Sequence, residues 1–264
     1  MRLTPAQFAR AATLEADQLR LMRLSRMSSG QLYALLNGDP VDAAVWVRSA
    51  AQCGVTAAQI RLGRMLLLGQ GMPRDQRAAY LWFVRAADEG NEEAMNMAGR
   101  CHELGWGVPV DLSLAAVHYR SSALAGHDWG QYNFGNLLFD GRGAARDLQQ
   151  AFSWYLRAAS QGHARAMNLL GRCFEEGWGC RSDLEDAAGW YRRSAEAGYF
   201  RGQFNHADML LTHGDVAAAA RWFWAAALGG DASTRRAIVG AIAQADDALL
   251  IQVASQVRRL DTTQ

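Results

Sequence analysis

A period of thirty-six residues runs through the middle of this chain. Aligned with itself, the sequence matches in units that begin at Ala58, Ala94, Gly130, Ala166 and Gly202. A period of this length is typical of stacked helical hairpins, in which each unit buries its apolar face against its neighbours. The repeat therefore predicts an all-α solenoid.

Small residues and rings occupy fixed positions in every full unit. The columns are a glycine in the first helix (Gly63, Gly99, Gly135, Gly171), a glycine-x-glycine loop from Gly69, Gly105, Gly141 and Gly177, an aspartate (Asp75, Asp111, Asp147, Asp183), a ring pair from Trp82, His118, Trp154 and Trp190, and a last glycine (Gly90, Gly126, Gly162, Gly198). The first glycine lets two helices approach closely. The aspartate is suited to cap the second helix, and the last glycine is expected at its C-terminal end.

Weaker matches flank the four full units, which span 58–201. Residues 1–57 predict an N-terminal helix, with Thr4 as its N-cap and Pro5 in its first turn, followed by a degenerate capping repeat. Residues 202–233 fit a shortened repeat, and residues 234–264 predict C-terminal capping helices, the first of them capped by Ser233. We therefore expect one solenoid domain over residues 1–264.

The pattern A-x-x-x-L-G-x-x-Y-x-x-G-x-G-V-x-x-D-x-x-x-A-x-x-W-Y-x-x-A-A-x-x-G resembles that of the Sel-one-like repeat family, relatives of the tetratricopeptide repeats. The resemblance covers residues 58–201 in full units and about 22–233 with the partial ones. It implies a right-handed αα-hairpin superhelix that serves as a platform for protein partners. Together with the replacement of every lysine by arginine, it favours a bacterial protein.

Composition narrows the range of functions. All 27 basic residues are arginine, so P-loop and Schiff-base lysine chemistry is excluded, and the net charge of +1 argues against a nucleic-acid-binding surface. No apolar run is long enough to span a membrane, and the first thirty residues lack the apolar core of a signal peptide. The four cysteines show no regular disulfide spacing. We therefore expect a cytoplasmic protein without a cofactor.

The segment GRCHELGWGVPVD places Cys101 and His102 side by side, as metal and catalytic sites can. Its second copy, GRCFEEGWGCRSD, has Phe174 in place of the histidine, and the same rows of the other units are apolar. We therefore expect Cys101 and His102 to be core residues, like His118 in the tryptophan column, and no metal or catalytic site. For Cys180, which lies in a loop, an exposed reactive thiol is the minor alternative.

The first helices of the units are expected to line the inner face of the superhelix. Alignment with the tetratricopeptide pattern puts a mixed set of side chains there, and the predicted partner-binding residues are Arg64, Asn96, Arg100, Tyr132, Asn136, Phe139, Asn168, Arg172 and Phe204. Amides can pair with a peptide backbone and arginines with a carboxylate or phosphate, so this groove predicts binding of a peptide with an acidic group. The alternative is a solvated face on which arginine and glutamate pair along the helix.

Trp106 and Trp178 lie in equivalent loops, each between two glycines. Each ring either packs under the neighbouring loop or anchors an interface at the edge of the stack.

The sequence as a whole predicts a non-catalytic scaffold or adaptor that binds a protein or peptide partner. One alternative is an inhibitor or immunity-type protein that blocks one enzyme or toxin. Another is an enzyme or small-ligand sensor, in which titratable groups such as Arg100, Glu103, Arg172 and Glu175 would converge on a closed pocket.

Overall fold

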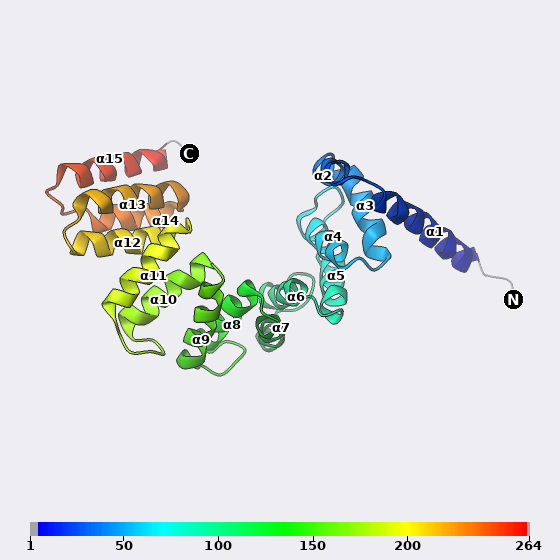
Figure 1. Ribbon diagram of the computed structural model, residues 1–264, viewed down its shortest axis with the longest axis horizontal. Helices are drawn as coiled ribbons and strands as arrows, with labels where there is room; N and C mark the ends of the chain where they lie inside the picture. The colour runs from blue at the N-terminus through cyan, green and yellow to red at the C-terminus, as the bar shows by residue number, and fades with distance from the viewer. Residues whose placement is uncertain (1–4, 263–264) are drawn as a thin grey trace. The chain divides into compact units, whose positions relative to one another are not determined.

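The computed structural model describes residues 5–262, which form helices and, over that range, no strands. The helices are α1 (Pro5–Ser25), α2 (Ser29–Asn37), α3 (Pro40–Gln52), α4 (Thr56–Leu68), α5 (Gln76–Asp88), α6 (Glu92–Leu104), α7 (Leu112–Leu124), α8 (Asp128–Asp140), α9 (Leu148–Ser160), α10 (Ala164–Glu176), α11 (Leu184–Glu196), α12 (Phe200–Thr212), α13 (Val216–Gly229), α14 (Ala232–Ala241) and α15 (Ala248–Thr262). The predicted all-α repeat solenoid is confirmed (Figure 1).

The chain divides into two compact units. Unit 1 comprises residues 1–130 and 142–144, and unit 2 comprises residues 131–141 and 145–264. In unit 1, helices α3 to α6 each pack against the next helix of the chain, and in unit 2 the same holds for α9 to α13. This order of contacts is the one expected for stacked hairpins. The single domain over residues 1–264 stays a prediction.

An aromatic ring seated on a glycine holds each full hairpin together. The rings of Phe83, Tyr119, Tyr155 and Tyr191 are at most 1% exposed. Each lies against the first-helix glycine of its own 36-residue repeat. A Cβ atom built on that glycine would come within 2.5 to 2.7 Å of the ring. The predicted close approach of two helices is therefore an approach of a ring to a backbone.

The second glycine of each loop touches the preceding hairpin. Gly107 has φ +74°, and a Cβ atom there would lie 2.2 Å from the carbonyl oxygen of Gln76, the first residue of α5. Gly179 has the same φ and would meet the carbonyl oxygen of Leu148, the first residue of α9, at 2.0 Å. Each loop thus rests on the N-terminal end of a helix in the hairpin before it.

The helix ends follow the sequence closely. The predicted aspartates cap α5, α7, α9 and α11, with side chains that accept hydrogen bonds from backbone N–H groups of the first turn. The glycines expected at the ends of these helices stand one residue beyond the C-cap, with φ between +82° and +100°. Both signals therefore predicted the length of the second helix in every full unit.

The terminal helices differ from the prediction in one cap. Asp231, and not Ser233, caps α14, because its Oδ1 atom accepts a hydrogen bond from the backbone N–H of Thr234 at 2.8 Å. Ser233 lies inside the helix and donates its hydroxyl to the same carboxylate at 2.8 Å. The predicted N-cap Thr4 lies outside the described residues.

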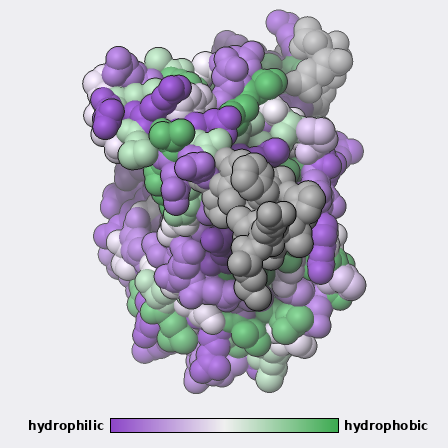
Figure 2. Space-filling model, turned by 90° about the vertical axis from the view of Figure 1, so that its right-hand side faces the viewer, coloured by the Kyte–Doolittle hydropathy of each residue, from purple (hydrophilic) through white to green (hydrophobic). Residues whose placement is uncertain are grey.

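Two terminal elements extend the stack. Helix α1 packs against α3, where Ser49 Oγ donates to the buried Asp17 Oδ1 at 2.6 Å, and α15 packs against α13 and α14. On the face shown in Figure 2, hydrophobic residues stand in separate patches among hydrophilic ones. Over the described part of the chain, none of the helices has the length and apolar character needed to cross a membrane.

Candidate functional site

A pocket of about 300 Å³ opens in unit 2 beside helices α8, α10, α12 and α14. Four of the predicted partner-binding residues line it: Tyr132, Asn168, Arg172 and Phe204. They are joined there by Arg165, Arg201 and Asn205, among others. We call this site the arginine pocket.

The inner part of the arginine pocket is made of amides and rings. Asn168 is only 5% exposed, and its Oδ1 atom accepts a hydrogen bond from Asn205 Nδ2 at 2.9 Å. The ring of Tyr132 stacks on the buried His163 at a centroid distance of 4.7 Å. These contacts fix the pocket wall, because a side chain held by a hydrogen bond or a stacked ring has little rotamer freedom left to lose on binding.

Three exposed arginines surround the opening. The guanidinium carbon of Arg172 lies 4.7 Å from the Trp178 ring centroid, which orients it by a cation–π contact. Arg165 and Arg201 occupy the second position of α10 and α12. Among the described residues that line the pocket, none carries a carboxylate. The site is therefore positively charged and suited to an anionic group.

Asp231, which does not line the pocket, stands close to Arg201. Hydrogen bonds from Thr234 and Ser233, with a smaller contribution from the nearby Arg201, lower the pKa of Asp231 to about 2. Asp231 is thus ionised at neutral pH and is engaged as the cap of α14. It reduces the positive potential near Arg201.

The structure does not bring the other predicted residues to this pocket. Asn136 accepts a hydrogen bond from the Tyr155 hydroxyl at 2.9 Å, and the Phe139 ring meets Trp178 edge-on at a centroid distance of 5.0 Å. Both side chains are half-buried within their hairpins. Their first role is therefore to hold unit 2 together.

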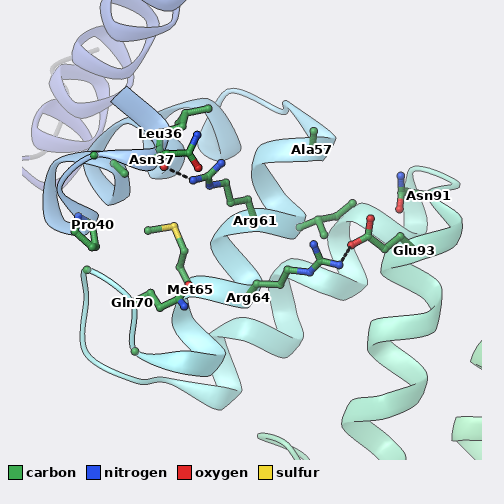
Figure 3. A pocket seen from close by; sticks show the side chains of 15 residues that line it. Leu36, Asn37, Pro40, Ala57, Arg61, Arg64, Met65, Gln70, Asn91 and Glu93 are labelled. Atoms are coloured by element: carbon green, nitrogen blue, oxygen red, sulfur yellow. Dashed lines mark hydrogen bonds and ion pairs between the residues drawn. The ribbon is translucent and has the colours of Figure 1, made fainter. Parts of the chain in front are cut away.

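Three predicted groove residues lie in unit 1. Asn96 is 5% exposed, as Asn168 is, and its predicted role toward a partner stays a prediction. Arg100 lies over the Trp106 ring at 4.7 Å. Arg64 pairs with Glu93 on the wall of a second pocket, of about 860 Å³ (Figure 3).

Sequence reasoning missed Arg165 and Arg201, although a signal for them exists. They are one period apart and so occupy the same column of the repeat, at the first turn of the first helix. The same column holds Glu93 in unit 1. The change from Glu93 to Arg165 and Arg201 along this column indicates that the surface charge differs between these repeats.

The cysteines and the neighbouring glutamates have structural roles. Cys101 and Cys173 are at most 1% exposed, and burial raises the pKa of each thiol to about 12. The half-buried Cys180 donates its thiol to the Cys173 carbonyl oxygen at 3.4 Å, and burial raises its pKa too, so it is not a poised nucleophile. Glu103 and Glu175 accept hydrogen bonds from the hydroxyls of the buried tyrosines of their units, at 2.6 and 2.5 Å.

The two tryptophans of the glycine-flanked loops are half-buried. Trp106 packs against the core of unit 1, and Trp178 lies between Phe139 and Arg172 in unit 2. Among the described residues, no group of three or more histidine, cysteine or acidic side chains is placed to hold a metal ion.

Two histidines fill positions that hold apolar residues in other units. His102 is 6% exposed and stacks on His118 at a centroid distance of 5.5 Å, with the Tyr80 hydroxyl 3.2 Å from its Nε2 atom. Burial lowers the pKa of His118, the neighbouring His102 lowers it further, and Asp88 opposes both. His118 is therefore held neutral between the helices.

This arrangement predicts a pH-dependent stability. Because the unfolded chain binds a proton at His118 more readily than the folded chain does, the free energy of unfolding should fall as the pH drops below about 6.5. The lowered pKa of His206 acts in the same direction. Urea unfolding at several pH values would measure the slope. His118→Trp, which restores the residue of the other units, should make the slope shallower, and an unchanged slope would contradict the assignment.

Hairpins of paired thirteen-residue helices, stacked with a ring seated on a glycine in each, define an αα-hairpin repeat protein. The model of the Sel1 repeat matches residues 56–91, 92–127, 130–163 and 164–199. These segments make up more than half of the chain, which therefore belongs to the Sel1 repeat family.

Several solved structures are similar to the chain. One is c5321, a protective antigen present in uropathogenic Escherichia coli strains that displays an SLR fold: 27% identity, TM-score 0.71, with 87% of this chain and 51% of that one covered. A Sel1 repeat protein from Oxalobacter formigenes has 23% identity, a TM-score of 0.70 and coverage of 84% and 95%. The immunity protein Pa5087 from Pseudomonas aeruginosa has 15% identity, a TM-score of 0.53 and coverage of 78% and 81%.

The chain spans about half the length of the Escherichia coli antigen. Comparison with curated protein sequences finds no match. The likenesses below a quarter identity show the shared fold alone.

Proposed function

We propose that this protein is a non-catalytic interaction scaffold that binds an acidic segment of a protein partner in the arginine pocket. The observation that carries the proposal is the convergence of Arg165, Arg172 and Arg201 on one pocket whose described lining holds no carboxylate. Guanidinium groups pair with carboxylates in a planar, two-pronged geometry, which gives direction as well as attraction.

The remaining lining suits a peptide. The rings of Tyr132 and Phe204 offer rigid apolar contact area, and the amides of Asn168 and Asn205 offer both donors and acceptors to a peptide backbone. Sel1 repeats are generally non-catalytic scaffolds, which agrees with this use of the pocket. A bacterial, cytoplasmic setting belongs to the same proposal. The bacterial sources of the similar structures support its bacterial part.

Selection of random peptides on the purified chain would test the proposal. We expect the selected peptides to be rich in aspartate and glutamate. Their affinity, measured by calorimetry, should fall by about 10- to 100-fold in Arg172→Glu, or about 1.4 to 2.8 kcal/mol. The binding should also weaken as salt is added, because the pairs lie at an exposed rim.

Arg193 provides a matched control. It is exposed in α11 of the same unit and lies 4.7 Å from the Trp190 ring, just as Arg172 lies 4.7 Å from the Trp178 ring, but it does not line the pocket. Arg193→Glu should therefore leave peptide affinity within about twofold of the original. Equal losses in the two variants, or selected peptides without acidic residues, would overturn the proposal.

The immunity proteins among the structural neighbours favour a second candidate. Two of them, Pa5087 and PA5088 from Pseudomonas aeruginosa, share the fold with this chain at TM-scores of 0.53 and 0.52. In this case the partner is one enzyme or toxin, and binding blocks it. The two candidates separate once a partner is in hand: an inhibitor abolishes the partner's activity at one-to-one stoichiometry, whereas a scaffold leaves that activity intact.

A further inference from the structure

Unit 1 contains an apolar pocket that the proposed function does not use. Its volume is about 510 Å³, within the range of pockets that hold small-molecule ligands, and helices α1, α2, α3 and α4 all contribute to its walls. The walls include Leu21 and Leu24 of α1, Leu32 of α2 and Trp46 of α3. We call this site the apolar pocket.

The chemistry of the walls restricts the occupant. The polar groups among the described lining side chains are the Ser25 hydroxyl, the Arg61 guanidinium and the indole N–H of Trp46. Ser25 already donates its hydroxyl to the Met22 carbonyl oxygen at 2.9 Å, and Arg61 already donates to the Leu36 carbonyl oxygen. A hydrogen-bonding group placed among the leucine, valine and alanine side chains, away from Arg61, would therefore leave its bonds unmade, whereas a hydrocarbon chain would lose nothing.

Arg61 stands at the border between the apolar pocket and the larger pocket of Figure 3. Its side chain lines both, as do Leu36 and Ala57. Figure 3 shows Arg64 reaching toward Glu93, while Arg61 reaches toward the end of α2. Apolar and charged surfaces thus meet at one residue.

Arg61 also lacks a counter-charge. It is half-buried, and within the described chain it makes no ion pair, although Arg64 one turn further along α4 does. A half-buried guanidinium with spare N–H donors is stabilised by an anion that reaches it. The same residue therefore supplies the charge complementarity that a plain apolar pocket lacks.

We infer that unit 1 binds an anionic amphiphile: a single hydrocarbon chain in the apolar pocket, with a carboxylate or phosphate head group against Arg61. The chain gains free energy for each methylene group withdrawn from water. The head group stays at the border with the larger pocket, where Arg61 faces it. This site is separate from the arginine pocket and does not depend on the proposed function.

Calorimetry of the full chain with saturated carboxylates from octanoate to palmitate, each below its micelle concentration, would test the inference. Affinity should rise by about fourfold for each added methylene and then level off once the chain fills the pocket. Dodecyl phosphate should bind like laurate, and dodecyltrimethylammonium should bind at least about tenfold more weakly because its head group repels Arg61. Affinity that does not depend on chain length would overturn the inference.

Three variants separate the parts of the site. Ala57→Leu places a larger side chain at the border and should reduce laurate affinity by at least about tenfold, whereas Ala34→Leu changes an equally exposed alanine of α2 outside both pockets and should not. Arg61→Gln keeps a donor for the Leu36 carbonyl oxygen and removes the charge. It should weaken laurate by about tenfold and leave the uncharged dodecanol unchanged. Equal effects of the two alanine variants, or equal losses for laurate and dodecanol, would refute the assignment.

The source of the amphiphile and the independence of the site are tested alongside. If the ligand is a free amphiphile, the protein stays in the supernatant when phosphatidylglycerol vesicles are sedimented. If the protein instead co-sediments with the vesicles and Ala57→Leu abolishes this, the ligand is a membrane lipid and a free amphiphile is ruled out. Arg172→Glu should bind laurate like the original chain, because Arg172 lies in unit 2. Loss of laurate binding in that variant would contradict a separate site.

Discussion

Replacing Gly171 with alanine is expected to destabilise unit 2 by about 3 kcal/mol. A Cβ atom at this position would lie 2.5 Å from two carbons of the Tyr191 ring, closer than any normal contact. The ring is 1% exposed and its hydroxyl donates to Glu175 at 2.5 Å, so it cannot move aside without breaking that hydrogen bond and the packing of the hairpin. Urea unfolding followed by far-ultraviolet circular dichroism would measure the loss.

Gly189 in α11 is the control for this substitution. It also lies inside a helix of unit 2, but a Cβ atom there would meet nothing within 4 Å. Gly189→Ala should therefore stabilise the unit by up to about 1 kcal/mol, because alanine has the higher helix propensity. Opposite signs for the two glycines are the expected result. A shared sign would mean that the ring does not rest on Gly171.

Replacing Gly179 with alanine is expected to cost about 3 kcal/mol or more. The Cβ atom would come within 2.0 Å of the Leu148 carbonyl oxygen, and a backbone oxygen at the start of a helix cannot rotate away as a side chain can. The residue also has φ +74°, which L-residues with a side chain adopt at a cost of about 1 to 2 kcal/mol. The unfolding transition should shift to lower urea concentration.

Gly198 separates the two contributions. Its φ is +82°, but a Cβ atom there would lie in open space. Gly198→Ala should therefore show the conformational cost alone, about 1 kcal/mol. The difference between the two variants measures the contact between the loop and α9. Equal losses would show that the loop of Gly179 does not rest on that helix.

Periodicity predicted the parts of this fold that depend on contacts within a unit. The aspartate caps, the glycines at the helix ends and the buried Cys101 and His102 are all set by residues close in sequence or in the same column. The family, too, could be recognised from these columns, since four units repeat them in register. Local signals of this kind do not change with the surroundings of the unit.

The candidate site was predicted less well, because its side chains meet across neighbouring units. Asn168 is buried by Asn205, thirty-seven residues further along the chain, and a row of polar residues does not reveal such a pairing. The predicted N-cap of α14 was wrong for a different reason. Asp231 and Ser233 are both good N-cap residues, and which of them caps the helix depends on where the backbone enters the helix.

The contact between each loop glycine and a helix of the preceding hairpin bears on how repeat proteins lengthen during evolution. Gly71, Gly107, Gly143 and Gly179 each meet the first residue of a helix that lies the same number of positions upstream. Every hairpin thus carries both contact surfaces: the helix N-terminus on which the loop of the next hairpin rests, and the loop glycine that rests on the preceding hairpin. A tandem gene duplication that copies whole hairpins would therefore preserve every one of these contacts. A gain or loss of a few residues between the helix N-terminus and the loop glycine would disrupt the contact.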